Sequence, residues 1–214
     1  MKVILIGNYS NFQYHPLDGP DKEISNILKE YGEIECTENY NAFTLENLKV
    51  YDICISYVDC WNEKLSQEQT AGIISFVAGG GSLLIIHNGI AFHSNYELAE
   101  LAGAKFVGHP AYTKLEFSNC KSNVPIMNDI PVFEMEEEPY RFEFSNFTKR
   151  DVFLKYIHEG KEYDAGWAIK FGLGKVAYLM PGHDKKSFQN PVYRQIILNS
   201  AKWLILSILF IITI

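Results

Sequence analysis

The chain has 214 residues and a formal net charge of −7 at pH 7. Hydrophobic residues make up 47% of the chain and charged residues 21%, a balance typical of a folded globular protein with one large domain. The acidic balance and the lack of a basic cluster argue against nucleic acid as a partner, because binding it requires Lys and Arg to neutralise phosphates.

The first half of the chain alternates between strand-like and helix-like segments. Continuous aliphatic runs predict buried strands at Val3–Gly7, Ile34–Thr37, residues 51–57 and Ser82–Ile86. Helices are predicted over residues 21–31, after Ser66 and after Asn95. Gln69 follows Ser66 by three positions, which is the pattern of a capping box. Because strands alternate with helices, we expect right-handed crossovers and a mostly parallel sheet.

The region from residue 111 to residue 178 has a different composition, rich in Phe, Tyr and acidic residues. Short strand-like runs lie at residues 112–117, 152–157, 165–171 and 175–180. Two glycines between the last two runs have the spacing of a tight hairpin, and a final helix is predicted to begin near Pro191. The expected fold is therefore α/β, a three-layer, open, mostly parallel sheet of the flavodoxin-like type with additional β-hairpin strands in the C-terminal half.

The end of the chain is almost wholly apolar from residue 203 onward. This run spans 12 residues, whereas a membrane helix needs about 20, so a membrane is not an expected partner. We divide the chain into a single domain over residues 1–206 and an apolar tail over residues 207–214, which could be a buried terminal helix, a homodimer contact or a disordered end. The four cysteines show no CxxC spacing, and with the short N-terminal apolar run they favour a cytoplasmic location.

Three of the six histidines, His87, His109 and His183, lie at the end or edge of an apolar segment with glycine close by. In an open α/β sheet, ligands bind just beyond the carboxyl ends of the strands, where glycine allows a close approach. Imidazoles in such a place can hold a divalent metal ion such as zinc, or act as acids and bases near neutral pH. Both chemistries stay open, because the sequence has no close-spaced ligand pair such as His-x-x-x-His.

Two carboxylates are candidates for completing this site. Asp184 follows the third of these histidines directly, although it could instead cap a local turn. Glu138 ends the acidic run over residues 136–138, a pattern that by default indicates a solvated surface patch. Among the remaining histidines, His15 and His93 are weaker candidates for the same cleft.

Aromatic and polar side chains near the predicted strand ends are candidates for binding a ligand. Trp61 and Tyr140 could stack on the apolar face of a sugar ring, although most aromatic residues in any chain belong to the core. Trp167, inside a predicted strand, is expected in the core. Asp59 lies at the end of the third predicted strand and Asn88 at the end of the fourth, so both could contact a ligand.

Several motifs follow one another in a recognisable order. They are the glycine run at residues 79–81 with the strand leading to His87, and the segments 101–110, 136–140, 165–167, 172–176, 182–184 and 188–191. Together they resemble the ThuA-like (trehalose utilisation) family over residues 50–203. The resemblance implies a fold similar to class I glutamine amidotransferases. In those enzymes a cysteine nucleophile stands at the strand-to-helix turn that His87 occupies here, so glutaminase activity is not expected.

The resemblance also implies a sugar-metabolism enzyme whose ligand is a disaccharide, a keto-sugar or a related polyol. Its reaction would be an isomerisation, epimerisation, elimination or hydrolysis. His87, His109 and His183 would serve as acid–base groups or as ligands of a divalent metal, with Asp184 and Glu138 orienting or charging the site. The alternative is a non-catalytic carbohydrate- or ligand-binding module, because one fold can host many functions.

Overall fold

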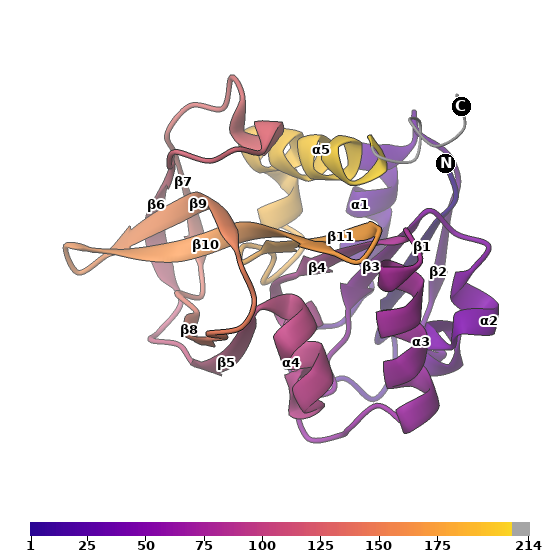
Figure 1. The fold of residues 1–214 in the computed structure, drawn as a ribbon. Helices are drawn as coiled ribbons and strands as arrows, with labels where there is room; N and C mark the ends of the chain where they lie inside the picture. The colour runs from indigo at the N-terminus through magenta and orange to yellow at the C-terminus, as the bar shows by residue number, and fades with distance from the viewer. Residues whose placement is uncertain (207–214) are drawn as a thin grey trace.

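A nine-stranded sheet crosses the molecule in the computed structural model, which describes residues 1–206 (Figure 1). The strands follow the spatial order β2-β1-β3-β4-β11-β10-β9-β6-β7. Neighbours from β2 to β11 are parallel, and neighbours from β11 to β7 are antiparallel. The sheet is therefore mixed, and the mostly parallel arrangement expected from the sequence describes one of its two halves. The tail predicted over residues 207–214 lies outside the described residues.

The parallel half of the sheet is built from the aliphatic runs. It contains β1 (Val3–Gly7), β2 (Ile34–Thr37), β3 (Ile53–Tyr57), β4 (Ser82–Ile86) and β11 (Gly174–Leu179). Every residue of β1, β3, β4 and β11 is buried, because these strands are covered on both faces. All four strands predicted in the first half of the sequence form, the third beginning two residues later than expected.

Helices lie on both faces of the sheet, which gives the expected three layers (Figure 1). α1 (Pro20–Leu28) and α5 (Pro191–Ile205) pack against each other on one face. α3 (Gln67–Ala78) and α4 (Tyr96–Ala102) pack together on the other face, with the short α2 (Leu45–Leu48) beside α3. No helix in residues 1–206 is long and apolar enough to cross a membrane.

Caps and short 3-10 segments complete the helical layers. The 3-10 segments are η1 (Tyr40–Phe43), η2 (His87–Ser94), η3 (Pro125–Met127) and η4 (Ser187–Gln189). At the start of α3, the Ser66 hydroxyl accepts a hydrogen bond from the Gln69 backbone N–H, and the Gln69 side chain accepts one from the Ser66 N–H. The predicted capping box is thus confirmed.

The last turn of α5 is fastened to the sheet. The Ser82 hydroxyl donates a hydrogen bond of 3.0 Å to the Leu204 carbonyl, and the Lys175 ammonium donates one of 2.6 Å to the Trp203 carbonyl. Ser82 is the first residue of β4 and Lys175 the second of β11. The helix therefore ends at the amino edge of the parallel strands, opposite the edge where the strands end.

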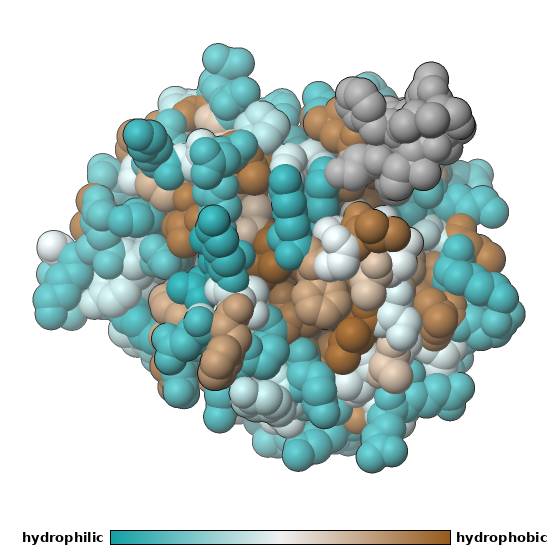
Figure 2. All heavy atoms as spheres, in the orientation of Figure 1, coloured by the Kyte–Doolittle hydropathy of each residue, from teal (hydrophilic) through white to brown (hydrophobic). Residues whose placement is uncertain are grey.

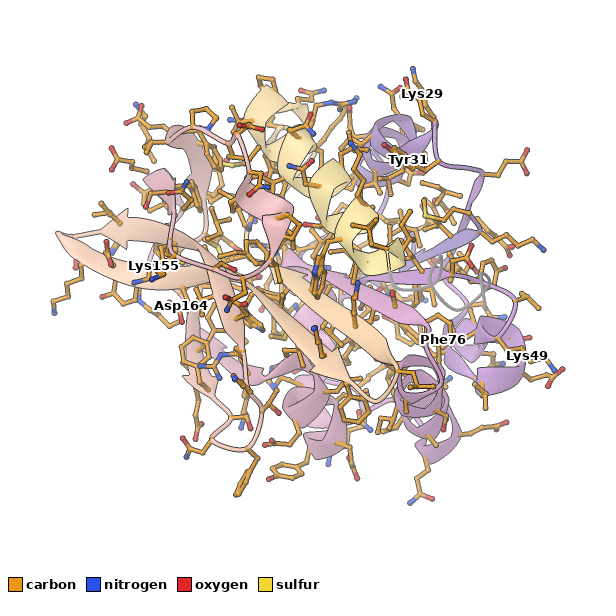
Figure 3. The ribbon with its side chains drawn as sticks, turned by 45° about the horizontal axis from the view of Figure 1, so that its top comes forward. Lys29, Tyr31, Lys49, Phe76, Lys155 and Asp164 are labelled. Carbon is orange, nitrogen blue, oxygen red and sulfur yellow. The ribbon has the colours of Figure 1, made fainter. Side chains whose placement is uncertain are left out.

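The antiparallel half of the sheet is built from the Phe-, Tyr- and Glu-rich region. It contains β6 (Thr113–Asn119), β7 (Phe133–Glu137), β9 (Asp151–His158) and β10 (Lys161–Phe171). The predicted glycine hairpin joins β10 to β11, with Phe171 paired to Gly174. Lys155 and Asp164 are partners across β9 and β10 and lie side by side in Figure 3. A separate small sheet pairs β5 (Ala104–Gly108) with β8 (Arg141–Phe144).

Buried hydrophobic side chains from both halves of the sheet form one core, whereas the surface is mostly polar. Trp167 is fully buried and stacks on Tyr178 with ring centroids 4.4 Å apart, as expected for a core residue. Figure 2 shows hydrophilic side chains around the outline of one face and apolar side chains gathered nearer its middle. This core fixes the strand ends, and the candidate site is assembled on the loops that follow them.

Candidate functional site

Four side chains converge beyond the carboxyl edge of the parallel strands. His15 lies in the loop after β1, His87 follows β4, His183 lies in the loop after β11, and Glu138 follows β7. One ligand atom from each lies within 4.8 Å of all the others. Oε2 of the glutamate lies 3.2 Å from both His87 Nε2 and His183 Nδ1, and 3.5 Å from His15 Nε2. We call these four residues the histidine–glutamate cluster.

His87 is held in one tautomer by its surroundings. It stands at the end of β4 with a φ of 47°, a backbone conformation that is uncommon outside glycine and is enriched at functional sites. Its Nδ1 lies 2.6 Å from the Met180 carbonyl oxygen, so Nδ1–H donates there and the lone pair of Nε2 faces Glu138. Burial lowers the pKa of His87 to about 4, so the imidazole is neutral near pH 7.

Asp59 orients His15 in a similar way. Nδ1 of His15 lies 3.2 Å from Asp59 Oδ1, which directs Nε2 toward Glu138. Asp59 Oδ2 accepts hydrogen bonds from the backbone N–H groups of Gln13, Tyr14 and His15, and so fixes the loop itself. Burial opposes a charge on His15, but the nearby carboxylates of Asp59 and Glu138 outweigh it and raise the pKa of the imidazole. The two carboxylates of Asp59 and Glu138 therefore favour a positive charge at the place where His15 lies.

The turn that carries His183 is held by a second carboxylate, Glu137. This side chain accepts hydrogen bonds from the backbone N–H groups of Gly182 at 2.9 Å and His183 at 3.2 Å, and from the hydroxyl of Ser187. Glu137 is completely buried, and its burial raises its pKa to about 7 in spite of these hydrogen bonds. The histidine is thus positioned by a buried group that does not touch the cleft.

The acidic run over residues 136–138 is not the solvated patch that its charge predicts by default. β7 turns alternate side chains to opposite faces, so Glu136 is exposed while Glu137 is buried. Glu138 comes directly after the strand, and its side chain is only 13% exposed. Three adjacent glutamates therefore have three different environments, and one of them supplies the charge of the cluster.

The histidine–glutamate cluster suits a divalent metal ion. Although burial opposes its ionisation, the neighbouring imidazoles of His15 and His183 hold the pKa of the Glu138 carboxyl well below its usual range, so it is charged. His15 Nε2 and His183 Nδ1 are buried and have no hydrogen-bond partner within residues 1–206. Three imidazole nitrogens and one carboxylate oxygen are ligands typical of zinc and related metals. The groups behind His15 and His87 are the outer partners that metal-ligating histidines use.

His109 borders the cluster without joining it. Its Nδ1 lies 2.8 Å from the Pro110 carbonyl oxygen, and its Nε2 lies 3.7 Å from Oε1 of Glu138, whereas the other three histidines contact Oε2. Tyr140 stacks on His87 with ring centroids 4.2 Å apart and on His109 at 5.4 Å. Of the candidates named from the sequence, His87, His183 and Glu138 thus lie in one group with His15, and His109 lies outside that group.

A cavity of about 530 Å³ opens beside the cluster. Trp61 and Tyr140, both predicted to contact a ligand, line it together with His15, His109 and Glu138. The Trp61 indole N–H donates a hydrogen bond of 2.7 Å to Asp59, so the ring is fixed in place. No Lys or Arg belongs to the described residues that line this main cleft. The lining is therefore rich in aromatic rings and includes one carboxylate and two imidazoles.

Three predicted site residues support the framework and do not line the main cleft. Asp59 has its carboxylate occupied by His15, Trp61 and the backbone described above, so it is a positioning group. Asn88 is fully buried, and its amide donates hydrogen bonds to the carbonyls that end β3 at 3.0 and 3.1 Å. Asp184 accepts hydrogen bonds from the backbone N–H groups two and three residues later, so it caps a turn.

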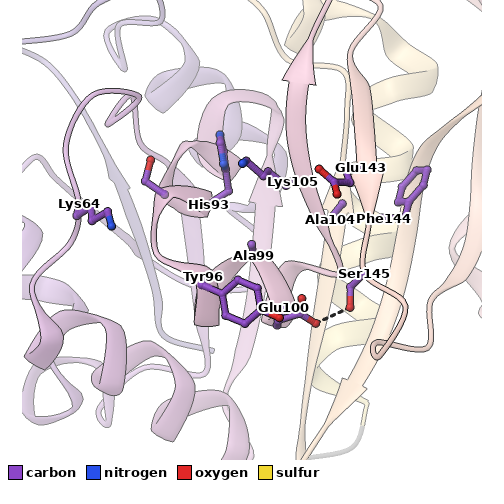
Figure 4. Close-up of a pocket in the computed structure, with 11 residues that line it drawn as sticks. Lys64, His93, Tyr96, Ala99, Glu100, Ala104, Lys105, Glu143, Phe144 and Ser145 are labelled. Atoms are coloured by element: carbon purple, nitrogen blue, oxygen red, sulfur yellow. Dashed lines mark hydrogen bonds between the residues drawn. The ribbon is translucent and has the colours of Figure 1, made fainter.

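A larger cavity of about 560 Å³ lies elsewhere, between η2, α4 and the small β5–β8 sheet (Figure 4). His93 lines it, and Glu100 and Ser145 are joined by a hydrogen bond across its floor. His93 packs edge-on against Trp61 with ring centroids 5.9 Å apart, so it backs the wall of the main cleft. None of the residues in the histidine–glutamate cluster lines this cavity.

A family model described as ThuA, trehalose utilisation, matches residues 2–204. The chain belongs to the ThuA family. A search of curated proteins finds no match. The family match extends the resemblance seen in the sequence to almost the whole described chain.

Solved structures share the fold of this ThuA chain at low sequence identity. A ThuA-like protein from Parabacteroides merdae superposes with a TM-score of 0.79 at 14% identity, covering 95% of this chain and 89% of its own. A cytoplasmic protein from Salmonella typhimurium gives a TM-score of 0.64 at 16% identity, covering 95% and 99%. A β-galactosidase from Rahnella sp. R3 gives 0.65 at 13% identity, covering 94% of this chain but 31% of its own.

Of two further members of the site, His15 was given too little weight in the sequence and Glu137 was missed. His15 lies in a polar loop eight residues after β1, and nothing near it marks a strand end. Its position after the first of the four strands predicted in the first half of the chain was the available signal, because the loops after parallel strands meet at one edge of a sheet. Glu137 was hidden inside the acidic run, and only the alternation of Phe133 and Met135 with glutamates indicated a strand with a buried face.

Proposed function

We propose that this ThuA-family protein is a metal-dependent enzyme that acts on a sugar. The observation that carries the proposal is the convergence of three imidazole nitrogens and one carboxylate oxygen within 4.8 Å, beside an aromatic-walled cavity. His15 and His87 are each oriented by an acceptor on the far side of the ring. Such preorganisation is typical of a functional metal site.

The cleft has the chemistry of a sugar site. Trp61 and the exposed Tyr14 present aromatic faces, on which the C–H faces of a sugar ring can pack, whereas Tyr140 is buried in the wall behind them. Because no Lys or Arg lines the cleft, a neutral ligand fits it better than an anion does. The family description and the shared fold of part of a β-galactosidase agree with a sugar ligand, although a fold alone does not specify a reaction.

The residues divide into ligands and a proton-transfer group. A divalent metal at the cluster would supply a Lewis acid that polarises a sugar oxygen. His109 is one-third exposed in the cleft wall, and because its Nδ1–H donates to a carbonyl, its Nε2 can take a proton from a sugar carbon or hydroxyl. Tyr140, stacked on His109 and His87, holds the base at the cleft and outside the ligand set.

This arrangement fits isomerisation, epimerisation or elimination at a sugar carbon, and hydrolysis if the same base activates water. It does not fit glutamine amidotransfer, which requires an activated cysteine thiolate. No cysteine among residues 1–206 belongs to the cluster or the main cleft. Burial raises the pKa of Cys60, the cysteine after β3, to about 12.

Metal analysis combined with turnover tests the proposal. Purified protein loaded with zinc, manganese or nickel should retain about one ion per chain, and His87→Ala should retain none. Trehalose, reducing disaccharides and their keto derivatives would then be assayed with loaded and chelator-stripped protein. Turnover that requires the metal supports the enzyme. Metal retained equally by the wild type and His87→Ala would refute the site, and tight sugar binding without turnover would favour the binding module.

A further inference from the structure

A second cavity adjoins the main cleft and shares two lining residues with it. It measures about 420 Å³ and lies between the loop after β1 and the loop after β3. Gln13 and Asn62 line both cavities, and the Asn62 amide donates a hydrogen bond of 2.7 Å to the Gln13 side-chain oxygen. Both cavities are within the range of about 300–1,000 Å³ that small-molecule sites occupy.

The two loops line both cavities with alternating residues. Along the first loop, Phe12 lines the second cavity and Tyr14 lines the main cleft. Along the second loop, Trp61 lines the main cleft and Glu63 lines the second cavity. An aromatic side chain is therefore present on each side of the Gln13–Asn62 bridge.

The second cavity is polar and carries no positive charge. The amides of Asn8 and Asn11 and the Tyr40 side chain line it, with Glu63 as a carboxylate and with Asp59, whose carboxylate is already occupied by hydrogen bonds. No Lys or Arg belongs to the described residues around it. Phe12 is 45% exposed, a large fraction for a ring beside hydrogen-bonding groups. An exposed aromatic face among neutral donors and acceptors suits a hydroxyl-rich ring, and the carboxylate disfavours a phosphate or a sugar acid.

We propose that the second cavity is a second sugar subsite. The substrate of the proposed function is then a neutral saccharide of at least two rings. One ring lies at the histidine–glutamate cluster, and the next packs on Phe12 across the Gln13–Asn62 bridge. This inference rests on the proposed function, but it concerns the size and charge of the substrate and not the chemistry at the metal.

Calorimetric titration of the full chain with glucose and with trehalose tests the subsite. The wild type should bind trehalose at least about tenfold more tightly than glucose, since stacking of a second ring adds about 1–3 kcal/mol if it matches base stacking on aromatic side chains. Phe12→Ala should weaken trehalose binding about tenfold and leave glucose binding within twofold. Phe147→Ala, which removes another exposed ring 88% accessible to solvent and away from both cavities, is the control.

Each result decides one of two questions. Equal affinity of the wild type for glucose and trehalose overturns the second subsite, and so does an equal loss of both affinities, or no loss, in Phe12→Ala. These results leave the proposed function standing, because metal content and turnover test it separately. If neither sugar binds and none is turned over, the proposed function fails and the subsite fails with it.

Discussion

The two halves of the sheet contribute different chemistry to one site. The parallel half provides imidazoles on the loops after β1, β4 and β11, all of them at one edge because parallel strands end together. The antiparallel half provides carboxylates, since Glu137 and Glu138 come from the end of β7. The small β5–β8 sheet adds His109 after one strand and Tyr140 before the other.

The difference shows how an edge strand can complete a site at the middle of a sheet. β7 is the last strand in the spatial order, four positions from β11. Nevertheless, Glu137 binds the backbone of the turn after β11, and the next residue enters the cluster. The parallel half therefore fixes where the ligands stand, and the antiparallel half fixes the charge between them.

The largest effect is expected from the group that we assign to proton transfer. His109→Ala should lower kcat about 10²–10⁴-fold, because a positioned general base contributes about this much. Metal content should stay at the wild-type level, because His109 lies outside the cluster. Steady-state kinetics with metal analysis of the same sample would check both. A loss of metal would show that His109 is a metal ligand, and the separation between metal ligands and a proton-transfer group would then be wrong.

A ligand from the parallel half should control metal affinity. His183→Ala should weaken metal binding by at least about 100-fold. Loss of a residue that only orients a metal ligand weakens binding by up to about 100-fold, and loss of a ligand itself should weaken it by at least as much. Its side chain is 29% exposed, so the fold should survive, and circular dichroism would confirm this. Competition with a chromogenic chelator measures the affinity. Wild-type affinity in this variant would remove His183 from the ligand set.

The outer partner in the same half should have a smaller effect. Asp59→Asn should weaken metal binding about 10–100-fold, because His15 loses the carboxylate that orients it. Asp184→Asn is the matched control, since that carboxylate caps a turn and contacts no cluster residue by hydrogen bond or ion pair within residues 1–206. Equal effects of the two changes would contradict the positioning role of Asp59.

The antiparallel half should respond in stability. Glu137→Gln should lower the free energy of unfolding by about 1–3 kcal/mol, because its amide N–H₂ must face one of the donors that the carboxylate accepts from. Urea unfolding measures the loss, with the exposed neighbour Glu136→Gln as control. If both variants unfold at the same urea concentration, the buried carboxylate does not hold the turn.

The smallest effect is expected from a residue outside the site, at the start of α3. Ser66→Ala should cost about 1 kcal/mol of stability through loss of the α3 cap. Metal affinity and kcat should not change. A change in metal affinity would show that lower overall stability is enough to weaken metal binding. The metal affinities of the other variants would then have to be corrected for their loss of stability.

Much of the parallel half could be predicted from the sequence, because its strands are buried on both faces and leave continuous aliphatic runs such as Ser82–Ile86. The strands β5, β7 and β8 could not, since they are short and carry charged residues on an exposed face. His87, His183 and Glu138 were predicted near one another from strand ends and motif order. His15 and Glu137 required the tertiary contacts of a loop and an edge strand, which single-sequence periodicity does not encode.

The fastening of α5 to the first residues of β4 and β11 has a practical consequence for every assay above. Because that helix ends at the amino edge of the parallel strands, Leu206 is separated from the histidine–glutamate cluster by about the length of strands β4 and β11. An affinity handle attached directly to Leu206, in place of residues 207–214, can tether the protein to a sensor chip or resin with the cleft turned toward the bulk solution. Sugar and metal titrations on immobilised protein should then agree with those made in free solution.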